Sequence, residues 1–200
     1  MPLNRVLEEI IAISQKLATK ERFEHMLRVA DWADRIARSH GFRDDRLKLA
    51  AFSHDMFRDV KPEVLLKLAR FYKLENKWYY FSRPVLLHGP VAAEYIRRRF
   101  NVDEEVYEAV YYHTSGAPGI GVIGKILTIA DVVEQSRDFP QVEELRKVAL
   151  NSSLDNAYGE VLKQKTLYAL ESKLLILPET TEAWNEYVER GGSYGGKAQN

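Results

Sequence analysis

Apolar residues recur every three to four positions along almost the whole chain, which is the period of an amphipathic α-helix. Glycines and prolines interrupt this pattern where helices would begin or end. We therefore expect helices over residues 3–17, 23–37, 45–57, 62–74, 90–100, 104–113, 120–136, a short segment after Pro140, 152–176 and 181–190. The apolar run 124–133 would also suit a buried strand, but the sequence offers no second strand to pair with it. The prediction is an all-α protein.

The chain is predicted to form one domain. Its 200 residues suffice for one sizeable core, and no repeat or linker divides them. We expect a single helical bundle over residues 1–190. The glycine-rich end, residues 191–200, is predicted to be a disordered tail.

The composition excludes several classes of function. Twenty-nine Lys and Arg residues balance 29 Asp and Glu residues, so no basic field attracts nucleic acid. The absence of cysteine excludes disulfides, thiolate zinc sites and cysteine nucleophiles. The N-terminus lacks a signal-peptide pattern, and no apolar stretch approaches the roughly 20 residues that span a bilayer. We expect a cytoplasmic protein that binds neither nucleic acid nor membranes, and aromatic residues on its helices are compatible with a homodimer.

Four histidines and two aspartates stand within or beside the apolar stripes of different expected helices. They are His25, His54, Asp55, His88, His113 and Asp131. One such residue alone is more often a core or surface residue with an ordinary partner. The joint pattern favours a metal site, because iron, manganese and zinc accept imidazole with carboxylate, and converging helices build such sites. The fifth histidine, His40, has no partner in the pattern and is expected at the surface.

The adjacent pair His54 and Asp55 allows two arrangements. Neighbouring residues on a helix diverge by about 100°, so the two side chains cannot reach one point along the same line. They would flank a single metal ion, or Asp55 would bridge two ions.

The order of these residues resembles the H…HD…D signature of the HD-domain metal-dependent phosphohydrolases. The flanking segments resemble one subfamily more closely, the YqeK-type symmetrical bis(5′-nucleosyl)-tetraphosphatases. These segments are HMLRVADWADRIA (25–37), AAFSHDMFRD (50–59), LLHGPVAAEYI (86–96) and the stretch 113–146, which carries HTSGAPG, AD and RDFPQVEELR in that order. The resemblance covers residues 20–150, and more weakly the helix that follows.

The resemblance implies a helical bundle of the HD-domain type that holds two divalent metal ions. One ion would be held by His25, His54, Asp55 and Asp131. Asp55 would bridge to a second ion, held by His88 and His113. Iron is the metal that the resemblance suggests, and manganese, cobalt and nickel accept the same ligands.

The activity that the resemblance implies is symmetrical hydrolysis of diadenosine tetraphosphate to two ADP, with a metal-bound hydroxide attacking an inner phosphorus. Arg58 and Arg137 are expected to bind the phosphates and to take part in catalysis; Arg58 stands where the family usually has lysine. Asp59 is expected to act as a general acid or base, or to pair with Arg58. Thr114 would contact a phosphate or cap its loop.

Three further features bear on the site. Glu134, one turn after Asp131, would orient metal ligands from behind, and Arg28 would pair with a core carboxylate. The aromatic segment 78–81 would stack an adenine or, more commonly for such a cluster, form a core or dimer contact.

Three other functions stay open. The first is another HD-type nucleotide phosphohydrolase, acting on a nucleoside mono- or triphosphate or a cyclic nucleotide. The second is an oxygen-using di-iron enzyme. The third is a non-catalytic nucleotide-binding regulatory module, and the presence of all six ligand residues weighs against it.

Overall fold

The computed structural model describes residues 2–75 and 77–191, and over these ranges it contains helices and no strand. The all-α prediction is therefore confirmed. The helices are α1 (Leu3–Leu17), α2 (Lys20–Ser39), α3 (Arg46–Ser53), α4 (Pro62–Tyr72), α5 (Trp78–Ser82), the 3-10 turn η1 (Pro84–Leu87), α6 (His88–Phe100), α7 (Glu104–Tyr112), α8 (Val122–Val133), α9 (Val142–Asn151), α10 (Leu154–Glu171) and α11 (Pro178–Glu189). Residues 192–200 of the predicted tail lie outside the described residues.

Side-chain caps and prolines mark the starts of several helices. The Thr19 hydroxyl accepts a hydrogen bond from the Arg22 amide at the start of α2. Asp103 caps α7 in the same way, and Ser153 caps α10. Helices α4 and α11 each begin with a proline at a first-turn position, where the missing N–H has no intrahelical partner to lose.

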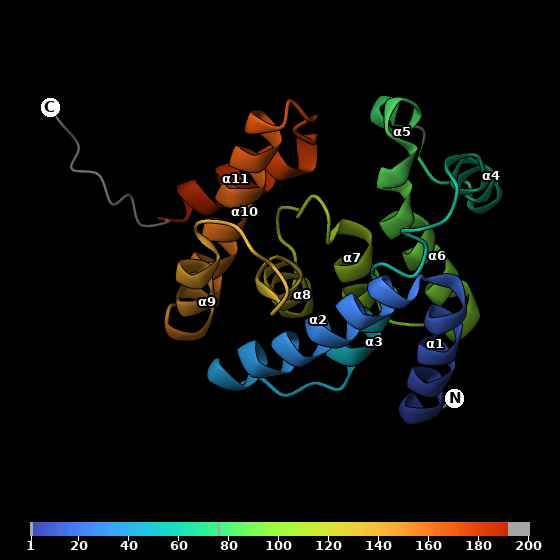
Figure 1. Cartoon of the computed structure of the whole chain (residues 1–200), viewed down its shortest axis with the longest axis horizontal. Helices are drawn as coiled ribbons and strands as arrows, with labels where there is room; N and C mark the ends of the chain where they lie inside the picture. The colour runs from blue at the N-terminus through green and yellow to red at the C-terminus, as the bar shows by residue number, and fades with distance from the viewer. Residues whose placement is uncertain (1, 76, 192–200) are drawn as a thin grey trace, which may run out of the picture.

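Helix α8 is the central element of the fold (Figure 1). It contacts α2, α3, α7, α9 and α10. Its sequence is apolar on nearly every face, and Ile123, Ile126, Leu127 and Ile129 are fully buried. A helix that is hydrophobic all round must be enclosed by others. In Figure 1, helices α4 to α6 lie to one side of α8, and helices α9 to α11 lie to the other.

The predicted helix 45–57 is wrong at its C-terminal end, and the error matters for the site. Helix α3 stops at Ser53, and residues 54–59 form successive turns. The Ala51 carbonyl, which would accept the Asp55 amide in a continued helix, instead accepts from the ring Nδ1 of His54. The His-Asp pair consequently stands on a turn.

Other boundaries also differ from the prediction. Segment 120–136 ends as helix at Val133, because the carboxylate of Glu134 accepts from the amide and hydroxyl of Ser136 and closes a local turn. Segment 152–176 is helical only to Glu171, since Lys173 takes the left-handed conformation that ends helices. The alternative of a strand over 124–133 is excluded, because α8 covers this run.

Candidate metal centre

The structure brings the six predicted ligand residues together from five parts of the chain. They are His25 on α2, His54 and Asp55 on the turn after α3, His88 at the start of α6, His113 directly after α7, and Asp131 on α8. They form two groups of three, within each of which the potential ligand atoms lie within 4.8 Å of one another. Converging helices thus place side chains that are far apart in sequence at one point.

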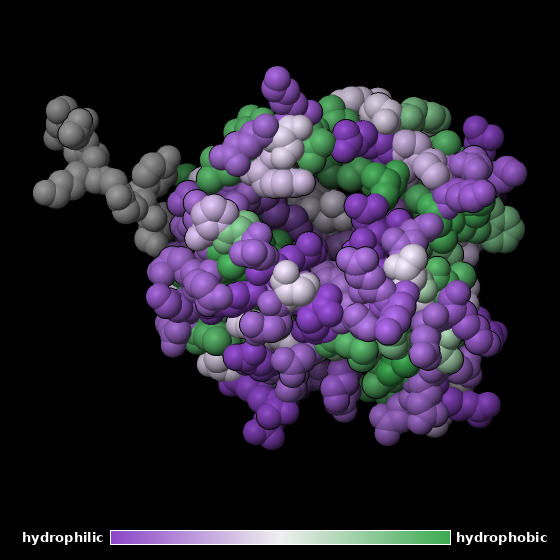
Figure 2. All heavy atoms as spheres, in the orientation of Figure 1, coloured by the Kyte–Doolittle hydropathy of each residue, from purple (hydrophilic) through white to green (hydrophobic). Residues whose placement is uncertain are grey.

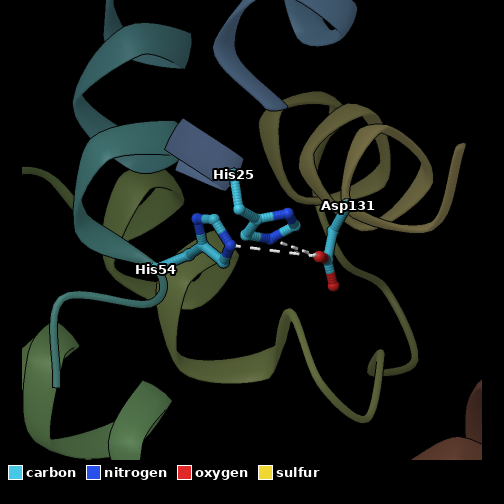
Figure 3. Close-up of side chains that lie close together, drawn as sticks. All are labelled: His25, His54 and Asp131. Carbon is cyan, nitrogen blue, oxygen red and sulfur yellow. Dashed lines mark ion pairs between the residues drawn. The ribbon is translucent and has the colours of Figure 1, made fainter. Parts of the chain in front are cut away.

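The first group consists of His25, His54 and Asp131 (Figure 3). The Nε2 atom of His25 lies 3.1 Å from Oδ1 of Asp131, and the Nε2 atom of His54 lies 4.0 Å from the same oxygen. Both rings point their Nε2 atoms toward this carboxylate. The three side chains therefore surround one point between α2, α3 and α8.

The second group consists of Asp55, His88 and His113. Oδ1 of Asp55 lies 3.1 Å from Nε2 of His88 and 3.6 Å from Nε2 of His113. The two Nε2 atoms are themselves 3.0 Å apart. This group also has its ring nitrogens and its carboxylate around a single point.

Asp55 lies between the two groups. Its Oδ1 atom faces His88 and His113, while its Oδ2 atom lies 3.8 Å from Nε2 of both His25 and His54. Each oxygen of Asp55 therefore faces the histidines of a different group.

Each of the four rings is held through its Nδ1 atom. His54, His88 and His113 bond backbone carbonyls of residues three positions earlier, at 2.8, 2.5 and 2.8 Å. Nδ1 of His25 lies 3.1 Å from the Glu134 carboxylate. A hydrogen bond of this kind puts the proton on Nδ1 and leaves the Nε2 lone pair for a metal. All four rings therefore present an electron pair to the centre.

The Nε2 atoms have fewer hydrogen-bond donors around them than their buried lone pairs require. Those of His25 and His54 are buried and, within the described residues, make no hydrogen bond. Those of His88 and His113 face each other at 3.0 Å, and the Thr114 hydroxyl can donate to only one of them if both Nδ1 atoms carry the ring protons. A cation in each group would remove both problems, so these donors fit divalent metal ions.

The pKa shifts of His54, His113 and Asp55 suit metal binding. Burial lowers the pKa of His54 to about 4 and also lowers the pKa of His113. Burial would raise the pKa of Asp55, but His54, His113 and His88 outweigh it and hold the pKa well below its usual range. Neutral imidazoles beside an ionised carboxylate are the forms in which these residues ligate metals.

Glu134 supports His25 from behind, as the sequence predicted. Its carboxylate is 1% exposed and accepts from His25, from Nε of Arg28 at 2.8 Å, and from both donors of Ser136. Arg28 thus pairs with a core carboxylate, also as predicted. The four contacts fix the position of the carboxylate and, through it, the orientation of the His25 ring.

Arg137 and Thr114 lie against the two groups. The Arg137 guanidinium donates to the Asp131 carboxylate and to the Asp131 carbonyl, each at 2.9 Å, and its side chain is 40% exposed. The Thr114 hydroxyl lies 3.1 Å from Nε2 of His113 and 3.4 Å from that of His88. Both residues are within reach of a ligand bound at the centre.

Arg58 and Asp59 stand further out on the turn that follows the His-Asp pair. Arg58 is half-buried, and its guanidinium has no partner among the described residues. Asp59 is exposed and accepts from the amide and hydroxyl of Thr19 at 3.0 and 2.8 Å. Burial would raise the pKa of Asp59, but the two bonds from Thr19 and the charge of Arg22 outweigh it and lower the pKa. Asp59 thus secures the start of α2 rather than pairing with Arg58.

Two cations of the centre were not predicted. Arg22 donates to Oδ2 of Asp55 at 2.7 Å, and its place three residues before His25 puts it on the same helical face, which is a usable sequence signal. Lys165 on α10 donates to the His113 carbonyl at 2.8 Å. It stands among ordinary surface lysines in the sequence, so no local pattern distinguishes it.

The remaining aromatic and histidine predictions concern residues outside the two groups. In segment 78–81, Tyr79 and Tyr80 are buried while Trp78 and Phe81 are exposed, so the segment is in part a core contact. His40 is half-buried and bonds the Ala149 carbonyl on α9 at 3.0 Å, so its predicted surface position is only partly right. Neither takes part in the centre.

The centre is enclosed on most sides. The side chains of the six residues are between 0% and 7% exposed, except for Asp131 at 16%. The half-exposed Arg137 lies beside Asp131, so a ligand reaches the centre most easily at this point. Figure 2 shows a hollow on the viewed face, between α5 and the pair α10–α11.

Comparison with known proteins defines the class. The HD domain family matches residues 22–136, a span that holds all six residues of the centre and more than half of the chain. The chain belongs to the HD domain family. The resemblance seen in the sequence is thereby confirmed.

The chain is also similar to individual proteins over most of its length. A protein of Halalkalibacterium halodurans named "Bis(5'-nucleosyl)-tetraphosphatase, symmetrical" is 32% identical over 173 residues, covering 85% of this chain and 90% of the relative. A protein of the same name from Staphylococcus aureus is 28% identical over 183 residues, 90% of this chain and 94% of the relative. The crystal structure of a predicted HD superfamily hydrolase involved in NAD metabolism, from Clostridium acetobutylicum, superposes with a TM-score of 0.84 at 26% identity, over 92% of this chain and 97% of that one.

Among the helices of the described residues, none combines the length and apolar character needed to cross a membrane.

Proposed function

We propose that this protein is a metal-dependent phosphohydrolase that cleaves diadenosine tetraphosphate symmetrically into two ADP. The observation that carries the proposal is the position of the Asp55 carboxylate. Its Oδ1 atom faces His88 and His113, and its Oδ2 atom faces His25 and His54. The names of the relatives support the substrate, because two of them that match most of their own length are called symmetrical tetraphosphatases.

The proposed centre binds two divalent ions. His25, His54 and Asp131 would hold the first, His88 and His113 the second, and Asp55 would bridge them. Iron is favoured, and manganese, cobalt and nickel suit the same ligands. When bound, such a pair would activate a water molecule and neutralise charge on a phosphate.

The surrounding residues have distinct roles in the proposal. Arg137, half-exposed beside Asp131, binds and neutralises the polyphosphate at the opening, and Arg58 offers a guanidinium with no protein partner among the described residues. Thr114 contacts a phosphate through its hydroxyl beside His113. Asp59, which accepts hydrogen bonds from the amide and hydroxyl of Thr19, acts as a general acid or base in the proposal.

Several wider predictions belong to the same proposal. We infer one HD domain over residues 1–190, a cytoplasmic location, a small nucleotide substrate without nucleic acid or membrane as partner, and a homodimer. The zero net charge supports a ligand gripped locally at the centre rather than a broad electrostatic surface.

A substrate panel tests the proposal against the alternatives. Protein loaded with ferrous iron without oxygen is offered diadenosine tetraphosphate, ATP, AMP and cyclic AMP. We expect the highest kcat/KM for diadenosine tetraphosphate and no turnover after chelation. Faster turnover of another nucleotide would favour a different HD phosphohydrolase, and binding without turnover at full metal occupancy would favour a regulatory module. In a separate assay with oxygen present, oxygen consumption with an organic substrate would indicate the di-iron enzyme.

The variant His54→Asn links the activity to the centre. The Asn amide can still donate to the Ala51 carbonyl, as Nδ1 of His54 does, but it offers no ring nitrogen to a metal. We expect loss of bound metal and of turnover with the helical circular dichroism retained. His40→Gln is the matched control, because His40 bonds only α9 and should keep both properties.

A further inference from the structure

Lys165 is a cation of the centre that comes from outside the HD domain match. It lies on α10, whereas the family match ends at residue 136. Its ammonium donates to the carbonyl of His113, a residue of the second group, at 2.8 Å. The C-terminal part of the chain therefore sends one charged side chain to the edge of the metal centre.

The ammonium of Lys165 is only partly satisfied. A lysine ammonium has three donors, and the His113 carbonyl uses one of them. Within residues 2–75 and 77–191, no carboxylate forms an ion pair with it, and its side chain is half-buried. A partly buried cation with no carboxylate at ion-pair distance is costly, so the position suits an anionic ligand.

The charges around Lys165 support the same reading. It is close enough to Asp131 for its charge to help lower the pKa of that carboxyl. Burial and Arg137 lower the pKa of Lys165 itself, while Asp131 and Asp55 raise it. These two carboxylates would be neutralised by metal ions, since two divalent cations bring four positive charges to the only two carboxylates among the six ligands. The loaded centre would then leave Lys165 facing further positive charge.

We propose that Lys165 binds a phosphate group of the nucleotide substrate, so that α10 contributes a substrate-binding residue to the centre. This inference rests on the proposed function, because it takes a nucleoside polyphosphate as the ligand. Arg137 bonds Asp131, the most exposed residue of the six, and Lys165 is near enough to act on the charge of Asp131, so two cations accompany the ligand residue that solvent reaches most. A polyphosphate chain that reaches Asp131 would meet both Lys165 and Arg137.

Binding of ADP to the metal-loaded protein tests this inference without turnover. The variant Lys165→Met keeps most of the apolar stem and removes the charge and its donors. We expect ADP to bind ten- to a hundred-fold more weakly by calorimetry, which is about the effect of removing a charged hydrogen bond. Lys165→Arg should retain affinity within a few-fold. Lys163→Met is the control, because Lys163 is exposed on the same helix and pairs with Glu160.

Metal content separates phosphate binding from a structural role. If Lys165 only held the His113 carbonyl, Lys165→Met would lose metal from the second group and weaken every ligand together, which would overturn the inference. So would an ADP affinity within two-fold of the wild type, or a wild-type protein that does not bind ADP. If ADP binding depends on Lys165 but diadenosine tetraphosphate is not cleaved, the proposed function fails while the contact stands.

Discussion

At the scale of single residues, the centre is organised by acceptors that lie behind the histidines. Three of these acceptors are carbonyls of the preceding helical turn, which any sequence at those positions would supply. The fourth, Glu134, is a side chain and is therefore open to substitution. His25 is the ring whose orientation depends most directly on one replaceable group.

Glu134→Gln should weaken metal binding about 10- to 100-fold, the usual effect of removing a carboxylate behind a metal-ligating histidine. Glutamine keeps the size of the side chain but cannot accept from His25, Arg28 and Ser136 together. Metal titration by calorimetry measures the change. Glu144→Gln, on an exposed glutamate of α9 paired with Lys147, is the matched control. Unchanged affinity in Glu134→Gln would show that the carboxylate does not hold the ring.

At the scale of elements, the sequence predicts helices well and their ends poorly. The apolar period alone predicts α1, α2 and α8, because a helix that packs against others needs a buried apolar stripe. The ends depend on local competition for backbone groups. The ring of His54 donates a hydrogen bond to the Ala51 carbonyl, and α3 ends at Ser53. The apolar period of the sequence cannot predict this bond.

The same limit applies to the candidate site. The six ligand residues could be predicted because buried imidazoles and carboxylates are anomalous in apolar helices and because their order resembles a known family. Glu134 could be predicted from its place one turn after Asp131 together with the resemblance, and Arg28 from its place three residues after His25. Lys165 could not be predicted, since α10 reaches the centre only through the packing of α10 on α8.

The approach of α6 to α7 depends on the absence of a side chain at Gly89. A Cβ atom there would lie 3.0 Å from Cε1 of His113 and 3.0 Å from the Val110 carbonyl. Gly89→Ala should therefore push apart the helices that carry His88 and His113. Overpacking of this kind costs about 1–3 kcal/mol, against a gain in helix propensity of at most about 1 kcal/mol.

We expect Gly89→Ala to bind one metal ion per chain where the wild type binds two. Gly159→Ala is a matched steric control, because its Cβ would meet the Tyr187 ring on α11, away from the ligands. It should lose stability without losing metal. Two tightly bound ions in Gly89→Ala would contradict the role given to the α6–α7 contact.

At the scale of the whole molecule, the buried histidines couple stability to pH. The folded protein lowers the pKa of His54 from 6.5 to about 4. Between these values the unfolded chain binds a proton that the folded chain does not, so unfolding becomes easier as the pH falls. The effect of His54 is absent above pH 6.5, and at pH 4 it lowers the free energy of unfolding by about 3 kcal/mol. His113 acts in the same direction, and His25, whose pKa is raised, opposes it.

Urea denaturation of the metal-free protein between pH 7 and 4 measures this coupling. Relative to His54→Asn, the wild type should lose about 3 kcal/mol of unfolding free energy over the range. A difference between the two proteins that stays constant with pH would show that His54 titrates normally. The metal-free protein is used because a metal ion that binds only the folded state adds its own, pH-dependent stability.

The central claim is that a two-metal HD centre cuts the tetraphosphate chain in its middle. The most direct test is to identify the products. Protein loaded with ferrous iron without oxygen is incubated with diadenosine tetraphosphate, and the nucleotides are separated by chromatography over time. The account predicts ADP as the sole product, two per substrate consumed. AMP and ATP in equal amounts would contradict the symmetrical cut and require a different position of the substrate between Arg137, Arg58 and the metal ligands.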